Sequence, residues 1–119
     1  MVLVGTLAVG AGIGLAGKPR VASTVSLRVT QEGEDTVFRG RVRSEDPRCE
    51  RRKVQITAGN GFKTTPVPEG TTRTDETGRY ELRVPTVMNG LGSYRAKALR
   101  KSRRAFVCKP ARSDIENPL

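Results

Sequence analysis

Apolar and polar side chains alternate with a period of two along most of the chain beyond residue 23, and this pattern constrains the fold more than any other feature. It recurs at residues 25–30, 38–43, 53–58, 79–84 and 94–99. Such alternation is typical of a strand that buries one face. No window of helical length keeps an apolar stripe with the 3.6-residue period. We therefore predict an all-β fold, an antiparallel β-sandwich of about seven short strands.

Polar residues, glycines and prolines separate the alternating segments, as expected of turns. These turn signals lie at residues 32–35 and 45–47, at Asn60-Gly61, at Pro66 and Pro68, which mark a loop, and at Pro85. Phe38, Tyr80 and Tyr94 fall on the apolar phase of their strands. We expect these three aromatic side chains to lie in the core.

The first 17 residues carry no charged side chain, and Lys18 and Arg20 end this apolar run. An apolar core followed by small residues is typical of a secretory signal peptide, although no basic residue precedes it here. The run is also about the minimum length for an uncleaved membrane anchor. Residues 12–17 match a dinucleotide-binding G-x-G-x-x-G pattern, but Pro19 follows where a helix should open.

We therefore predict a signal peptide or membrane anchor over residues 1–23 and a single β-sandwich domain over residues 24–119. A cleaved signal peptide would leave a mature N-terminus between Gly17 and Thr24. If the leader is not cleaved, it is the only part of the chain that we expect to contact a membrane.

Composition argues against catalysis. The 119 residues include no histidine, which excludes histidine acid–base chemistry and histidine metal ligands. No G-x-S-x-G or S-x-x-K motif occurs, and the carboxylates fall mainly in turns. A nucleophile without a neighbouring base is not activated. We predict that the protein is not an enzyme and holds no cofactor or metal.

Basic residues outnumber acidic ones by 22 to 12, which gives a net charge of +10. Such a charge attracts polyanions without sequence preference, although a solvated outer sheet face would carry the same residues. The aromatic residues that stack on bases are missing from the basic strands, so no specific nucleic acid is expected. The candidate polyanion contacts are Arg39, Arg41, Arg43, Arg51, Arg52, Lys53, Arg100, Lys101, Arg103 and Arg104.

Cys49 and Cys108 are the two cysteines of the chain. Two thiolates without histidine give only half of a tetrahedral zinc site, and no C-x-x-C redox motif is present. If the leader directs secretion, a disulfide is the expected state, and we expect it to join the two sheets. The alternative is a pair of buried free thiols in a cytosolic protein.

Five pieces of the chain resemble a known type of domain. They are the segment with Gly40-Arg41-Val42, a cysteine before Arg51-Arg52-Lys53-Val54, residues 74–80, residues 92–96 and a second cysteine at position 108. Together they resemble β-sandwich domains of secreted actinobacterial proteins, which are similar to carboxypeptidase regulatory-like (transthyretin-like) and bacterial Ig-like domains. The resemblance implies a non-catalytic module with an accessory, structural or adhesive role.

Residues 74–80 have the composition of a tight turn. Asp75 can accept a hydrogen bond from the backbone two residues on, and Gly78 can take the positive φ that ends such a turn. Asp75 and Glu76 could instead bind calcium, but two carboxylates are too few ligands on their own.

These observations predict a monomeric module that is secreted or held at the cell surface. Its expected partners are acidic cell-wall polymers or other surface proteins of the cell envelope. The alternative function is that of a basic β domain that binds nucleic acid or another polyanion.

Overall fold

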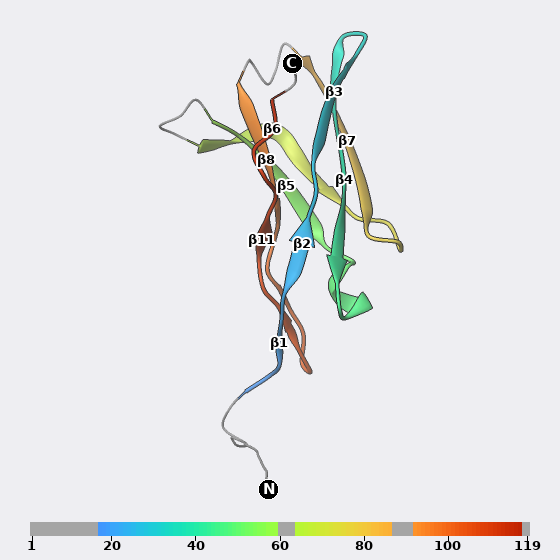
Figure 1. Ribbon diagram of the computed structural model, residues 1–119, viewed down its shortest axis with the longest axis vertical. Helices are drawn as coiled ribbons and strands as arrows, with labels where there is room; N and C mark the ends of the chain where they lie inside the picture. The colour runs from blue at the N-terminus through green and yellow to red at the C-terminus, as the bar shows by residue number, and fades with distance from the viewer. Residues whose placement is uncertain (1–16, 60–63, 87–91, 118–119) are drawn as a thin grey trace, which may run out of the picture.

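The computed structural model describes residues 17–59, 64–86 and 92–117. Its strands form two four-stranded sheets and one three-stranded sheet, and Figure 1 shows the two larger sheets side by side. The all-β sandwich is confirmed. Residues 1–16, which hold the apolar run and nearly all of the G-x-G-x-x-G pattern, lie outside the described residues. The predicted Asn60-Gly61 turn also lies outside them.

The first sheet has the strand order β11-β8-β5-β6. Its strands span Lys53–Gly59 (β5), Thr64–Arg73 (β6), Ser93–Ala98 (β8) and Ala111–Arg112 (β11). All neighbouring pairs are antiparallel. Val54, Ile56 and Ala58 of β5 pack in the core, so the alternating side chains of Lys53, Gln55 and Thr57 point outward.

The second sheet is built around β4, which spans Asp35–Ser44. Ser23–Val25 (β2) and Arg28–Glu32 (β3) pair with successive parts of β4, and Arg79–Pro85 (β7) pairs with residues 35–41. A 3-10 turn, η3, follows β4 at Pro47–Cys49. Its Asp46 cap accepts a hydrogen bond from the backbone N–H of Arg48 at 3.0 Å.

The third sheet lies at one end of the sandwich and has the order β1-β10-β9. It comprises Arg20–Val21 (β1), Lys101–Ser102 (β9) and Val107–Cys108 (β10). Backbone N–H groups of Val107 and Lys109 donate to the carbonyls of Pro19 and Val21 at 2.9 and 2.8 Å. The folded domain therefore includes residues 19–23, which the sequence assigns to the leader.

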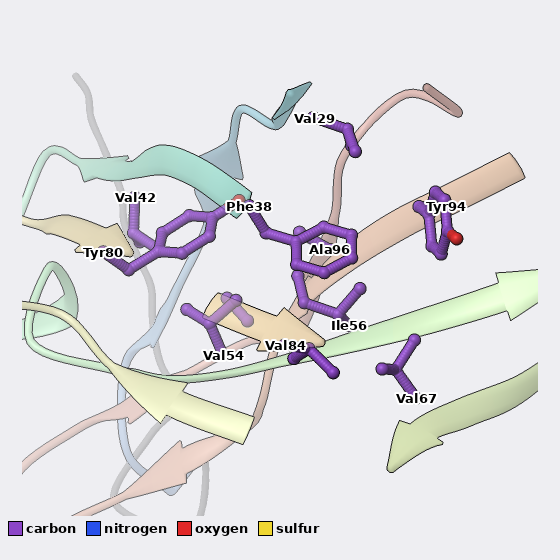
Figure 2. Packing of buried hydrophobic residues seen from close by; sticks show 11 residues of the cluster. Val29, Phe38, Val42, Val54, Ile56, Val67, Tyr80, Val84, Tyr94 and Ala96 are labelled. Carbon is purple, nitrogen blue, oxygen red and sulfur yellow. The ribbon is translucent and has the colours of Figure 1, made fainter. Parts of the chain in front are cut away.

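The core lies between the two larger sheets. Phe38, Tyr80 and Tyr94 are buried in it, as predicted, and Figure 2 shows their rings in a row. The Phe38 and Tyr94 rings pack edge to face, with centroids 5.1 Å apart. The aliphatic remainder consists mainly of valines, joined by isoleucine and alanine: Val29, Val42, Val54, Ile56, Val67, Val84, Ala96 and Ala98.

Two local predictions differ from the structure. The alternating run at residues 25–30 is divided between β2 and β3, and the carbonyl of Ser26 at the break accepts a hydrogen bond from the Tyr80 hydroxyl. Pro66 and Pro68 lie within β6 and not in a loop. Prolines are tolerated there because β6 is an edge strand with an irregular register opposite Gln55 and Thr57.

Candidate functional site

Acidic neighbours neutralise part of the basic face that the sequence predicts on β4. Arg39 forms ion pairs with Glu32 and Glu81, each at 2.8 Å. Arg83 on β7 joins the same network through Glu32 at 2.8 Å. The bonds from Arg39 and then Arg83 lower the pKa of the Glu32 carboxyl. Because Glu32 and Glu81 already neutralise the Arg39 guanidinium, Arg39 is a poor contact for an acidic polymer.

Arg41 and Arg43, the other predicted contacts on β4, form no ion pair with a described carboxylate. Arg41 donates from Nε to the carbonyl of Thr77 at 3.0 Å, and Arg43 is exposed. Both line a shallow hollow of about 810 Å³. Two carboxylates, Asp75 and Glu81, border the same hollow and offset its positive charge.

Arg52 is almost entirely buried and bonded within the fold, which makes it a poor contact for a polymer, although it borders two hollows of the basic surface. Only 3% of the residue is exposed. Its guanidinium donates to the carbonyls of Leu99 and Lys109 at 2.9 and 2.8 Å and to the Ser23 hydroxyl at 2.9 Å. Burial lowers its pKa. The role of Arg52 is to join chain segments inside the fold.

Most of the remaining predicted contacts gather at one end of the first sheet. We call this cluster the basic pole; it surrounds two adjoining hollows of about 230 and 540 Å³. Its members are Arg51, Lys53, Arg73, Arg100, Lys101 and Arg103. Arg104, also predicted, is exposed in the turn between β9 and β10 but does not line either hollow.

Strand pairing and backbone carbonyls hold the basic pole together. Lys53 and Arg73 are direct cross-strand partners on β5 and β6. Lys101 donates from Nζ to the carbonyls of Arg48 and Arg51 at 2.7 and 3.0 Å. Burial, followed by the positive charges of Arg103, Arg52 and Arg51, lowers the pKa of Lys101. The pole therefore concentrates positive charge that its own residues do not neutralise.

Carboxylates near the basic pole compensate little of this charge. Glu76 approaches Arg51 at 3.9 Å, but both side chains are mostly exposed, and exposed ion pairs of this kind are weak. Asp75 is occupied within its own turn, where Oδ1 accepts from the backbone N–H groups of Thr77 and Arg79 at 2.8 and 3.0 Å. Gly78 ends the turn with φ +86°, so the predicted Asp75 turn is confirmed.

A disulfide between Cys49 and Cys108 supports the same end of the molecule. The Cα atoms are 5.6 Å apart, within the range that a disulfide requires. The expected bond is confirmed, but it does not join the two large sheets. It links η3 to β10 of the small third sheet, where both sulfurs pack with Phe106 and Val21. Arg48 lies over the Phe106 ring at 4.0 Å.

Arg73 of the basic pole is not among the contacts predicted from the sequence, and neither are the basic residues of the outer face beside it. Arg95 and Lys97 on β8 and Arg112 on β11 face outward from the first sheet. The strands of the first sheet contain a single carboxylate, Glu69 of β6, whereas β3, β4 and β7 of the second sheet contain Glu32, Asp35 and Glu81. That difference in acidic content is visible in the sequence and would have shown which basic face is unbalanced.

Other kinds of site receive no support from the described part of the chain. No three Asp, Glu or Cys side chains within residues 17–59, 64–86 and 92–117 gather closely enough to hold a metal ion. Within the same ranges no helix has the length and apolar character needed to cross a membrane. The chain matches no protein-family model, and no curated protein matches it.

Proposed function

We propose that this protein is a non-catalytic extracellular β-sandwich module whose basic pole contacts acidic polymers of the cell envelope. The concentration of Arg51, Lys53, Arg73, Lys101 and Arg103 around two adjoining hollows carries the proposal. Long flexible cations around an open hollow suit a chain of repeated negative charges, because each contact releases counterions and none requires one fixed geometry.

The disulfide supports the extracellular part of the proposal. Disulfides persist in oxidising compartments and are rare in the cytosol. The resemblance of the chain to secreted carboxypeptidase regulatory-like and bacterial Ig-like domains points the same way, and such modules serve accessory or adhesive roles. Aromatic and aliphatic side chains fill the core between the two sheets. We therefore look for the binding surface on the outer faces of the sheets.

Intact mass of protein exported from its native host tests the location. We expect loss of a leader and a mass 2 Da higher after reduction, since two thiols replace one disulfide. We further expect the new N-terminus at Gly17 or Lys18, because the carbonyls of Pro19 and Val21 accept hydrogen bonds from Val107 of β10 and from Lys109 directly after it. Cytosolic protein with Met1 intact and free thiols would contradict the extracellular location and favour the nucleic-acid alternative.

Two double variants that each remove two positive charges test whether the basic pole binds the polymer. The double variant Arg51→Gln, Arg103→Gln removes two charges from the basic pole, and Arg28→Gln, Arg43→Gln removes two exposed charges from the opposite sheet. Binding to polyglutamate, poly(glycerol phosphate) and duplex DNA is measured for each. We expect the pole variant to lose several-fold more affinity than the control for every polymer. Equal losses would show that net charge alone governs binding, and tight binding restricted to one DNA sequence would favour the alternative function.

A further inference from the structure

A further cavity lies on the outer face of the first sheet and does not belong to the basic pole. This groove of about 250 Å³ crosses β5, β8 and β11 and reaches the C-terminal segment. Its cationic side chains are Arg95, Lys97 and Arg112, and its neutral polar side chains include Gln55 and Thr57. None of these residues lines either hollow of the basic pole.

The cationic side chains of the groove lie close together, so that they repel one another. Lys97 and Arg112 are direct cross-strand partners, and like charges in that position are destabilising. Within the described residues, no carboxylate forms an ion pair with Arg95, Lys97 or Arg112. The Nε atom of Arg95 is buried and has no hydrogen-bond partner in the same residues. An anion in the groove would relieve the repulsion and satisfy this donor.

The uncharged side chains of the groove indicate which chemical group carries the bound anion. Gln55, Thr57 and Ser93 offer amide and hydroxyl groups that can bond to ligand hydroxyls. Ile115 also lines the groove and is the one large apolar side chain that the described chain leaves exposed, at 55%. A binding groove commonly combines a few polar groups with apolar surface in this way. The lining therefore suits a small hydroxylated carbon skeleton beside the charged group.

We propose that the groove binds a phosphate group carried on a sugar or polyol. Three cations match a phosphate better than a single carboxylate, because phosphate offers more oxygen acceptors and up to two charges, and arginine binds it through paired donors. Arg95, Lys97 and Arg112 bind the phosphate oxygens. Gln55 and Thr57 bind the hydroxyls, and Ile115 contacts the carbon skeleton.

The test is a titration of the isotope-labelled protein followed by NMR, with glucose 6-phosphate, glycerol phosphate, glucose and inorganic phosphate as separate probes. We expect saturable shifts at Gln55, Thr57, Lys97 and Ile115 with the two phosphate esters, weaker binding of inorganic phosphate and none of glucose. A poly(glycerol phosphate) chain that binds more tightly than either monomer, with shifts at the same residues, identifies a polymer repeat as the source of the ligand.

Two sets of variants complete the test. Lys97→Gln, Arg112→Gln should weaken glucose 6-phosphate binding about tenfold or more, since it removes charged hydrogen-bond donors, whereas Arg28→Gln, Arg43→Gln should leave it nearly unchanged. Ile115→Ser should weaken glucose 6-phosphate but not inorganic phosphate. Equal effects of the groove and control variants, equal binding of all anions, or no saturable shifts would overturn the proposal. The basic-pole variant Arg51→Gln, Arg103→Gln should leave this site intact, so failure here is separate from failure of the polymer-binding function.

Discussion

Arg52 donates a hydrogen bond from Nη2 to the carbonyl oxygen of Lys109 at 2.8 Å, across 57 positions of sequence. The same guanidinium bonds to the Ser23 hydroxyl and to the carbonyls of Cys49 and Leu99. It thus joins β2, η3, the end of β8 and the segment after β10. Because a planar guanidinium offers five donors in a fixed arrangement, no other side chain can serve all these acceptors.

Arg52→Ala should lower the free energy of unfolding by about 2–4 kcal/mol, since it leaves several buried carbonyls without donors. Arg52→Lys should recover only part of the loss because an ammonium cannot span the same acceptors. Urea denaturation measures the effect, with Arg51→Ala as the exposed neighbouring control. A stability loss for Arg52→Ala no larger than for the control would show that these bonds are dispensable.

Loss of the Cys49–Cys108 bond should destabilise the protein without changing the fold. The bond closes a loop across 59 positions, and its removal from a small domain costs about 2–5 kcal/mol. The double serine variant should keep the β-rich circular dichroism spectrum of the parent but melt at a lower temperature. An unchanged melting temperature would contradict this account, as would a parent whose melting temperature does not respond to reductant.

Gly40 and Tyr80 form a close contact that larger side chains cannot enter. A Cβ atom at position 40 would lie 2.0 Å from the Ser26 carbonyl oxygen and 2.5 Å from the Tyr80 hydroxyl. Gly40→Ala should therefore cost about 1–3 kcal/mol through overpacking. Tyr80→Phe keeps the ring but removes the 2.6 Å bond to Ser26, at a cost of about 1–2 kcal/mol. Thermal or urea unfolding of both variants tests the contact, and a stabilised Gly40→Ala protein would refute it.

Acid should destabilise the protein through carboxylates that the fold keeps ionised. Bonds from the side chain and backbone of Thr77 and from the backbone of Arg79 lower the pKa of Asp75. Since this pKa is lower in the folded than in the unfolded chain, the stabilisation is present above about pH 4 and is lost as pH falls through the folded value. Asp75→Asn keeps an acceptor oxygen but does not titrate, so its stability should fall less steeply between pH 7 and acid. Identical acid profiles for the variant and the parent would argue against this contribution.

The fold was largely predictable because its strands follow period-two alternation, which directly reports the buried face. Phe38, Tyr80 and Tyr94 lie in the core as that phase requires. The strand break at Ser26 was not predictable, because it depends on the Tyr80 hydroxyl, which is remote in sequence.

The candidate surface was only partly predictable because a count of charges does not show which charges are neutralised. Arg39 looks like a free cation in the sequence, yet Glu32 and Glu81 balance it from neighbouring strands. Arg52 sits between two exposed basic residues but turns inward to carbonyls from distant segments. Arg73 joins the basic pole only through the pairing of β5 with β6.

The salt dependence of polymer binding tests the central claim most directly. For the parent, the logarithm of the association constant for poly(glycerol phosphate) should fall linearly with the logarithm of salt concentration, by about 0.7–0.9 for each phosphate contacted. The variant Arg51→Gln, Arg103→Gln should show a slope shallower by about one to two, whereas Arg28→Gln, Arg43→Gln should keep the parent slope. A parent whose affinity is independent of salt, or a slope that changes equally in both variants, would contradict the assignment of polymer binding to the basic pole.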